Sequence, residues 1–192
     1  LSFGQKIFKI LKALKKFSII EPICVHLLHK ESGQQNLKQN KTNKKFIYLI
    51  SPNKIENDDF YNDLALVFSI KKVSFFQLRL KKETNKNKLK IGKKIKKICK
   101  KYKVKFLIND EPEIAKKLNA DGCHLGQKDM SILKARKILK KKMIGVTCHN
   151  SIPLAKKAIA AGADYLAFGA FYPSKTKKIK YKANLKILNL AK

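Results

Sequence analysis

The sequence predicts an α/β protein of the (β/α)8 TIM-barrel type, of which only about six βα units are present. Short apolar runs that favour strands alternate with helical stretches, which is the pattern of βα units and a parallel sheet. Polar residues gather where the predicted strands end, and barrels carry their chemistry at those ends. Neither GxGxxG nor the P-loop motif occurs, so the nucleotide-binding signatures of open sheets give no support to that alternative.

Length and composition are those of one folded domain. The 192 residues include 44% apolar residues, which is too many for a disordered basic tail. No apolar run reaches the roughly 18 to 20 residues that a membrane-spanning helix needs. The four cysteines are far apart and form no CxxC pair, so we expect reduced thiols and a cytoplasmic protein.

The charge is strongly positive, with 45 Lys and Arg against 13 Asp and Glu. Such a balance can indicate nucleic-acid binding. Only Arg79 and Arg136 are arginines, however, and recognition of phosphates and bases favours the guanidinium group. We therefore expect solvated lysine faces and no nucleic-acid partner. A degenerate protein that binds RNA or an acidic surface is kept as an alternative.

The first 45 residues are predicted to precede the barrel domain. Apolar residues recur at helical spacing in residues 3–17, with lysines on the other face, which predicts a basic amphipathic helix. Residues 30–45 are nearly without apolar side chains and predict a flexible linker. The domain boundaries are therefore 1–45 for this leader and 46–192 for the incomplete barrel.

The elements of the domain follow in order along the chain. Each predicted strand is a short apolar run, such as FIYLI at 46–50. The strands are expected at 46–50, 75–80, 104–108, 122–125, 143–147 and 165–169. The helices are expected at 60–70, 89–102, 111–118, 132–139, 154–161 and 183–191.

The second predicted strand ends in a group of hydrogen-bond donors. Gln77, Arg79 and Lys81 alternate along it, so their side chains should project from one face. Lys177 joins them from the loop after the last strand. We expect the group to bind an anion, with a solvated lysine surface as the alternative.

Two carboxylates follow the third and fourth predicted strands, which should be neighbours. Asp110 and Asp129 can converge there on Mg²⁺, which usually takes one or two protein carboxylates. Asp110 can equally be the N-cap of the next helix, and spacing alone does not decide. Asn109 can bind a phosphate oxygen or cap the turn.

Further polar residues are found at 173–177 and at two histidines. The segment PSKTK offers two hydroxyls and two ammonium groups, which suit a phosphate. His124 lies within a predicted strand and is expected to pack or hydrogen-bond locally. His149 follows the next strand, and neither histidine has metal-ligand spacing.

Five segments together resemble the thiamine phosphate synthase family, within the thiamine monophosphate synthase and TenI superfamily. They occur in the order and spacing of the family: QLRLK at 77–81, IND at 108–110, DGCHLGQKDM at 121–130, IGVTCH at 144–149 and GADYLAFGAFYPSKTK at 162–177. The resemblance implies a Mg²⁺-dependent transferase of thiamine biosynthesis with a barrel fold. It would couple hydroxymethylpyrimidine diphosphate to thiazole phosphate, giving thiamine phosphate and pyrophosphate.

The resemblance also implies roles for individual residues. Asp110 and Asp129 would hold Mg²⁺. Arg79, Lys81 and Lys177 would act in catalysis, by neutralising the departing pyrophosphate. The substrate-binding set would be Gln77, Leu78, Arg79, Leu80, Lys81, Asn109, Thr147, Ser174, Lys175, Thr176 and Lys177. Small phosphorylated substrates are the expected partners, and a homo-oligomer is left open.

The sequence departs from the family in two ways. Thr147 stands where the family usually has Ser, which keeps the hydroxyl. The chain begins with Leu1 and ends after six predicted strands, so we expect a C-terminally truncated product, poorly active alone, with two unpaired sheet edges. A thiazole tautomerase-like enzyme of the same superfamily is the alternative enzyme class.

Overall fold

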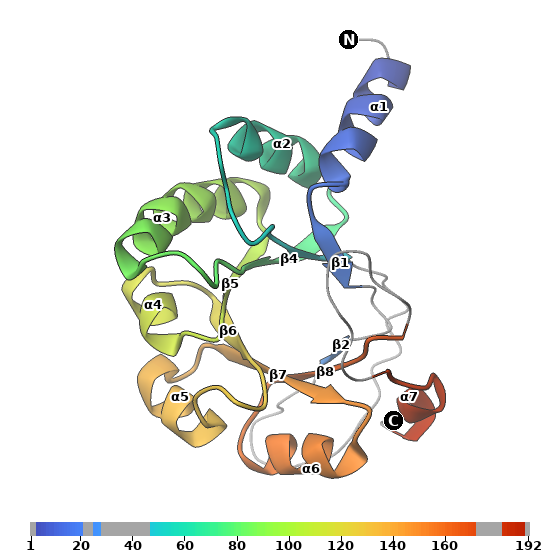
Figure 1. Ribbon diagram of the computed structural model, residues 1–192, viewed down its shortest axis with the longest axis vertical. Coiled ribbons are helices and arrows are strands. Elements are labelled where there is room, and N and C mark those ends of the chain that lie inside the picture. The colour runs from blue at the N-terminus through green and yellow to red at the C-terminus, as the bar shows by residue number, and fades with distance from the viewer. Residues whose placement is uncertain (1–2, 21–24, 28–46, 172–181, 191–192) are drawn as a thin grey trace.

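The parallel strands lie in one curled sheet with helices on its outside (Figure 1). The computed structural model describes residues 3–20, 25–27, 47–171 and 182–190. Six parallel strands neighbour one another in chain order: β3 (Ile47–Ile50), β4 (Val73–Leu78), β5 (Lys105–Asn109), β6 (Gly122–Leu125), β7 (Met143–His149) and β8 (Tyr165–Phe168). The predicted α/β class with a parallel sheet is confirmed. The six parallel strands form a curled half-barrel, which agrees in number with the about six βα units predicted.

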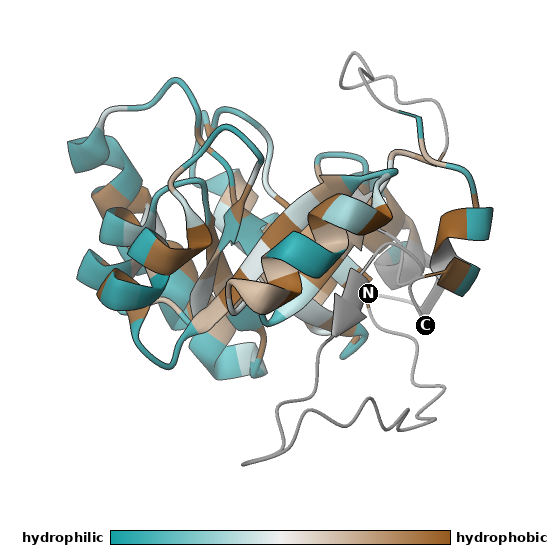
Figure 2. Ribbon diagram, turned by 90° about the horizontal axis from the view of Figure 1, so that it is seen from below, coloured by the Kyte–Doolittle hydropathy of each residue, from teal (hydrophilic) through white to brown (hydrophobic). Residues whose placement is uncertain are grey.

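Helices connect these strands as the alternation predicts. They are α2 (Asp59–Phe68), α3 (Asn85–Tyr102), α4 (Pro112–Lys117), α5 (Ile132–Leu139) and α6 (Ile152–Ala160), with α7 (Lys186–Leu190) after β8. Hydrophobic and hydrophilic residues alternate around the helices in Figure 2, as expected for helices with one face on a sheet.

The leader supplies a helix and two short strands. Helix α1 (Phe3–Leu14) confirms the amphipathic helix, although it ends three residues early. Strand β1 (Ser18–Ile20) pairs antiparallel with β3, and β2 (Val25–Leu27) pairs antiparallel with β8. The expectation of two unpaired edges is therefore wrong for the parallel strands, because three residues of β3 and three of β8 are paired; the outer strands of the sheet are instead β1 and β2. The predicted linker, residues 30–45, lies wholly outside the described residues.

The turn after α1 packs into the core beside β4. Phe17 is buried, and its ring centroid lies 5.4 Å from that of Phe60 and 6.3 Å from that of Phe76. Ala13 is buried as well. The leader therefore contributes apolar contacts to the domain as well as edge pairing.

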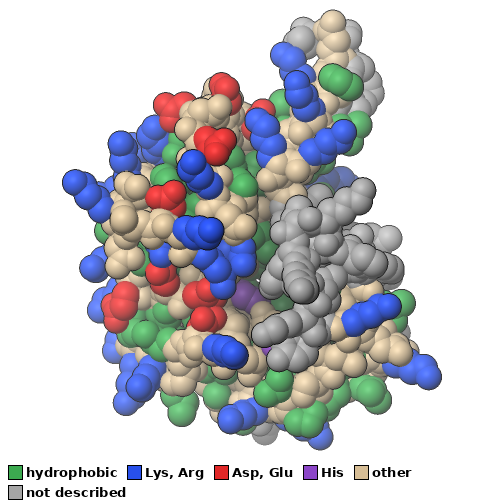
Figure 3. Space-filling model, viewed as in Figure 1, with side chains coloured by type: hydrophobic (Ala, Val, Ile, Leu, Met, Phe, Trp, Pro, Cys, Tyr) green, Lys and Arg blue, Asp and Glu red, His purple; other side chains and the backbone are tan. Residues whose placement is uncertain are grey.

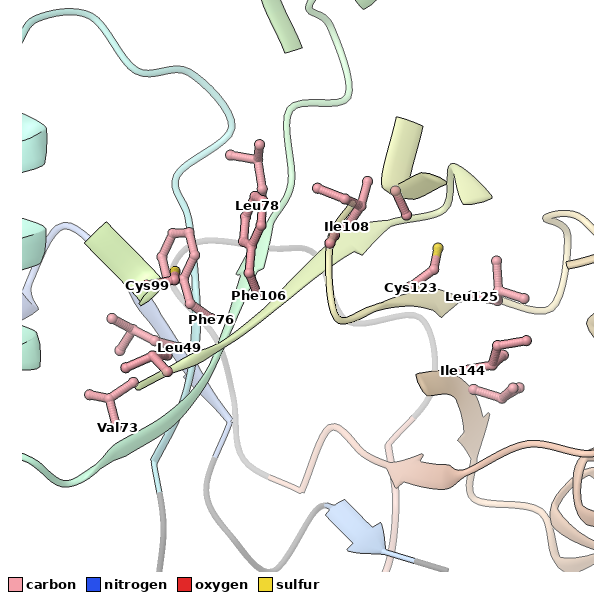
Figure 4. Close-up of a cluster of buried hydrophobic side chains, with 14 of the residues drawn as sticks. Leu49, Val73, Phe76, Leu78, Cys99, Phe106, Ile108, Cys123, Leu125 and Ile144 are labelled. Atoms are coloured by element: carbon pink, nitrogen blue, oxygen red, sulfur yellow. The ribbon is translucent and has the colours of Figure 1, made fainter. Parts of the chain in front are cut away.

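Two apolar layers lie on opposite faces of the sheet. The larger one fills the space between strands and helices, and in Figure 4 Phe76, Leu78, Phe106 and Ile108 project into it from β4 and β5. The smaller one, inside the curl, contains Tyr48, Phe75, Leu107 and Tyr165. The period of two along each strand produces this division, because successive side chains point to opposite faces.

One glycine makes room for the inner layer. A Cβ atom on Gly145 would lie 1.8 Å from Cζ of Tyr165. A side chain at position 145 would therefore occupy the space of the Tyr165 ring. The Tyr165 side chain reaches into the curl because its neighbour in β7 has none.

An arginine closes the end of the sheet where β7 and β8 begin. Arg136 Nη2 donates to the carbonyl oxygen of Gly162 at 2.7 Å and also pairs with the Asp164 carboxylate. Arg136 Nη1 donates to the carbonyl oxygen of Lys142 at 2.7 Å. Asp164 in turn accepts from the N–H of Ile144 at 2.7 Å. This cluster lies opposite the strand ends that carry the predicted site.

A hydrogen bond at the end of the element explains two of the differences between predicted and observed bounds. Strand β4 ends at Leu78 rather than at residue 80, because the N–H of Arg79 donates to Oγ of Ser51 at 2.9 Å instead of continuing the ladder. Helix α3 begins four residues early, at Asn85, because the Thr84 side chain caps it by accepting from the N–H of Asn87.

Candidate active site

Asp110 stands directly after β5 in a left-handed backbone conformation, with φ of 63°. Its N–H donates to the carbonyl oxygen of His124 at 2.8 Å, which fixes the turn to the end of β6. The N-cap of α4 is Glu111, so the N-cap alternative for Asp110 is wrong. The Asp110 carboxylate instead lies 3.1 Å from Nζ of Lys81.

Asp129 joins this pair from the loop after β6. Its Oδ2 accepts from the N–H of Gly126 at 2.6 Å, which turns the carboxyl group back towards the strand end. Burial raises the pKa of Asp129, and so does a hydrogen bond shared with the Asp110 carboxyl; Lys81 acts in the opposite direction. The structure therefore brings together the two carboxylates that were predicted to converge.

A buried polar chain begins at the inner face of β4. The Gln77 side chain is 2% exposed, accepts from the hydroxyl of Tyr48 at 2.7 Å and donates from Nε2 to Oδ1 of Asn109. The Tyr48 hydroxyl lies 2.9 Å from the Tyr165 hydroxyl. Burial raises the pKa of both tyrosines. They belong to β3 and β8, the first and last parallel strands.

The chain continues from Tyr165 to the end of β7. Nδ1 of His124 lies 2.9 Å from the Tyr165 hydroxyl, and Nε2 lies 2.8 Å from Oγ1 of Thr147. The backbone oxygen of Thr147 also accepts from the Gln127 side chain. We call this series the interior chain: Asn109, Gln77, Tyr48, Tyr165, His124 and Thr147. Each of the six parallel strands contributes one of its members.

Sequence reasoning did not single out the two tyrosines. Both sit at inward positions of strands, two residues from Ile50 and from Ala167, and there they look like ordinary β-formers. A usable signal was present, because a buried tyrosine hydroxyl needs a partner and Gly145 leaves space opposite Tyr165. His124 hydrogen-bonds within the fold, as expected.

The predicted group of three donors on one strand face is only partly correct. Gln77 faces the interior, and Lys81 pairs with Asp110. The Arg79 guanidinium donates to Oδ1 of Asn53, in the loop after β3. The alternation breaks because the strand ends at Leu78, so the residues beyond it follow the loop.

The remaining predicted residues are buried or undescribed. Leu78 and Leu80 are 3% and 4% exposed, and both line the cavity beside Lys81 and Asp110. Ser174, Lys175, Thr176 and Lys177 lie outside the described residues. Their predicted phosphate contacts are therefore not placed by this structure.

A cavity of about 150 Å³ opens beside the Lys81–Asp110 pair. Asn109 lines it, and so do Lys88 and Glu111, which form an ion pair of 2.7 Å. Acidic and basic side chains lie close together on this face, next to a histidine in Figure 3. Within the described ranges, no cluster of three or more His, Cys, Asp or Glu could hold a metal, so a cation here would have two carboxylates and the substrate as ligands.

The described helices include none that is long and apolar enough to span a membrane.

Comparison with known proteins identifies the family. A family model described as thiamine monophosphate synthase matches residues 47–192. A thiamine-phosphate synthase of Pelagibacter ubique is 76% identical over 156 residues, which are 81% of this chain and 75% of that relative. A thiamine-phosphate synthase of Nitrosomonas eutropha is 40% identical over 147 residues, which are 76% of this chain and 69% of that relative.

A solved structure agrees with these relatives. The thiamine phosphate pyrophosphorylase from Pyrococcus furiosus matches with a TM-score of 0.51 and 31% identity. The match covers 54% of this chain and 51% of the chain of that structure. This chain therefore spans about half the length of that relative. The family model and the relatives confirm the resemblance that the five sequence segments show. The chain belongs to the thiamine monophosphate synthase family.

Proposed function

We propose that the rim at the ends of the parallel strands couples hydroxymethylpyrimidine diphosphate to thiazole phosphate, giving thiamine phosphate and pyrophosphate. The relatives are named for this step of thiamine biosynthesis. One observation supports the assignment to this rim above all. Asp110, Asp129 and Lys81, from three separate strand ends, meet at one point beside the cavity that Asn109 lines.

The charges of the rim suit a diphosphate leaving group. In the reaction the C–O bond between the pyrimidine methylene and the diphosphate breaks, and pyrophosphate leaves with the electron pair. The lone pair of the thiazole nitrogen then forms the new C–N bond, so no protein nucleophile is required. Lys81 and Arg79 stabilise the negative charge that grows on pyrophosphate, as preorganised cations do in other transferases. Lys177 is proposed for the same role.

The two carboxylates fit Mg²⁺. Burial raises the pKa of Asp129 most, and the neighbouring Asp110 carboxyl raises it further, both through a hydrogen bond and through its negative charge. A hard divalent cation between two carboxylates removes the repulsion. When bound, Mg²⁺ would supply positive charge to the diphosphate oxygens. Lys81 holds Asp110 in place for that contact.

Polar groups around the carboxylates would orient the substrates. Gln77, Asn109 and Thr147 are proposed for the pyrimidine diphosphate, together with the backbone of Leu78 and Leu80. Ser174, Lys175 and Thr176 are proposed for the thiazole phosphate. We place the reaction in the cytoplasm, where the free thiols of the buried Cys99, Cys123 and Cys148 would stay reduced.

Binding and coupling assays with the purified chain test this proposal. Titration calorimetry should show Mg²⁺-dependent binding of hydroxymethylpyrimidine diphosphate, and thiamine phosphate should form when thiazole phosphate is added. Asp110→Asn should remove the Mg²⁺ dependence of binding. The control is Asp58→Asn, which changes a carboxylate that is 82% exposed and paired with Lys94. Binding that is equally strong without Mg²⁺, or is unaffected by Asp110→Asn, contradicts the proposal.

A further inference from the structure

We infer that the interior chain is directional and fixes the hydrogen-bonding character of the site, with a donor presented by Asn109 and an acceptor presented by Thr147. Tyr48, Tyr165 and His124 are then positioning residues for the substrate. The identity of the ligand rests on the proposed function. The choice between the two possible directions also draws on the charge of that ligand, whereas the direction itself can be measured on the ligand-free chain.

The direction follows from counting hydrogens, beginning at Gln77. The Tyr48 hydroxyl has one hydrogen and donates it to Oε1 of Gln77 at 2.7 Å. In the 2.9 Å contact between the two tyrosine hydroxyls, the donor must then be Tyr165. The Gln77 amide nitrogen donates to Oδ1 of Asn109, so the Asn109 oxygen is engaged. What Asn109 can offer a ligand is its NH₂ group.

The same count fixes the other half of the chain. Because Tyr165 has used its hydrogen, it can only accept from His124, and Nδ1 of His124 must carry a hydrogen. In a neutral imidazole the other nitrogen is an acceptor. Thr147 therefore donates its hydroxyl hydrogen to Nε2 of His124 at 2.8 Å. The lone pairs of the Thr147 oxygen are left to accept from a ligand.

The opposite direction is one competing arrangement, and a doubly protonated His124 that donates to both Tyr165 and Thr147 is the other. If the amides of Gln77 and Asn109 were rotated, every bond along the chain would reverse, and His124 would carry its hydrogen on Nε2. Asn109 would then turn a carbonyl oxygen towards the cavity beside Lys81 and Asp110. A diphosphate needs donors there, so the charge of the proposed ligand favours the direction described above.

The direction has a consequence for substrate choice. A pyrimidine with an exocyclic amine can donate to Thr147, and its diphosphate can accept from Asn109. A pyrimidine with an oxo group at the amine position would face the Thr147 oxygen with a second acceptor. Sites with fixed polar groups reject such analogues strongly, because one buried group stays unpaired. The interior chain would thus help to select aminopyrimidines over oxopyrimidines.

Nitrogen NMR of the ligand-free chain tests the direction without any assay of activity. The experiment uses ¹⁵N-labelled histidine at pH 7.5, with His124 assigned by the loss of its signals in His124→Gln. We expect the neutral Nδ1–H tautomer of His124. An Nε2–H tautomer or an imidazolium ring at this pH overturns the inference. Tyr61→Phe, on α2, is the matched control and should leave the tautomer unchanged.

A substrate comparison tests the consequence. Binding of the amino and oxo pyrimidine diphosphates is measured for the native chain and for Tyr165→Phe, which keeps the ring and removes the hydroxyl. We expect the preference for the amine to fall about tenfold in Tyr165→Phe and to be retained in Tyr61→Phe. If Tyr165→Phe does not fold, Thr147→Val replaces it, with Thr147→Ser as the variant expected to restore the preference.

The two experiments separate the inference from the proposed function. An Nδ1–H tautomer with no binding of either pyrimidine contradicts the proposed function and leaves the direction of the chain intact. An Nε2–H tautomer with normal coupling contradicts the inference alone. The third outcome assumes that Tyr165→Phe folds and that the native chain has the expected tautomer. If the preference for the amine is then unchanged in Tyr165→Phe, the positioning role is refuted.

Discussion

Nζ of Lys81 lies 3.1 Å from Oδ2 of Asp110, and this ion pair connects the loop after β4 to the end of β5. The Lys81 side chain is 52% exposed, so water screens the pair and it adds little to the stability of the fold. Its effect is local, because burial and Asp110 raise the pKa of Asp129 and the charge of Lys81 opposes that rise. The ammonium group is therefore placed to balance two carboxylates and an incoming anion.

Replacing Lys81 by methionine should reduce coupling and leave the fold intact. We expect kcat/KM to fall by about two to three orders of magnitude, the scale of losing one preorganised electrostatic contact. The free energy of unfolding should change by less than about 0.5 kcal/mol, because the pair is exposed. Steady-state kinetics and urea denaturation measure the two quantities. Lys82→Met, at the exposed neighbouring position, should affect neither. Unchanged kinetics in Lys81→Met would remove the residue from the mechanism.

Much of this site could be predicted because topology places it. Residues that directly follow neighbouring parallel strands must lie at one edge, and Asp110 and Asp129 accordingly meet. Strand β6 and helix α5 also match prediction residue for residue, since glycine and a capping serine mark their starts. The predictions that were wrong concern features that depend on tertiary contacts. The turn of Arg79 towards Asn53 is decided by Ser51, which lies 28 residues away in the sequence.

Which residues of the interior chain pair with one another could not be predicted from the sequence, for a related reason. Tyr48 and Tyr165 are separated by 117 positions, and nothing in either strand indicates that their hydroxyls meet. Likewise, a run such as SII at residues 18–20 is too short to predict as a strand. Strand β1 forms because β3 offers it an unpaired edge.

Arg136→Lys should destabilise the fold and spare the active site. A lysine cannot reproduce the fork of the guanidinium, which reaches the carbonyl oxygens of Lys142 and Gly162 and the Asp164 carboxylate together. We expect a loss of about 2–3 kcal/mol in the free energy of unfolding, measured by urea denaturation. Lys137→Met, exposed on the same helix, serves as the control. Ligand affinity of the folded fraction should not change, because the cluster lies at the opposite end of the strands. A stability equal to that of the native chain contradicts this account.

Stability should decline at alkaline pH because of the buried phenols and thiols. Burial raises the folded-state pKa of Tyr48 and Tyr165 above the ordinary tyrosine value of 10.0, and that of Cys148 from 9.0 to about 11. Above these ordinary values the unfolded chain loses protons that the folded chain retains. The stabilisation is therefore complete below about pH 9 and is lost as the pH rises, by up to about 1.4 kcal/mol per pH unit for each group.

Tyr165→Phe isolates one part of that decline. Urea denaturation at intervals from pH 8 to pH 11 should give a shallower fall above pH 10 for this variant than for the native chain. Tyr61→Phe is again the matched control, since the Tyr61 side chain is only partly buried. Parallel curves for the native chain and Tyr165→Phe would show that the buried hydroxyl does not contribute to the pH dependence.

Gly145→Ala should disturb the inner layer at Tyr165. The new Cβ would lie 1.8 Å from Cζ of the Tyr165 ring, so the ring or strand β7 must move. Overpacking of this kind typically costs about 1–3 kcal/mol, which urea denaturation can measure. Combining it with Tyr165→Leu tests the cause, because the shorter side chain leaves room for the methyl group. The double variant should lose less stability than the sum of the two single variants. Additive losses would place the strain of Gly145→Ala elsewhere than at the Tyr165 ring.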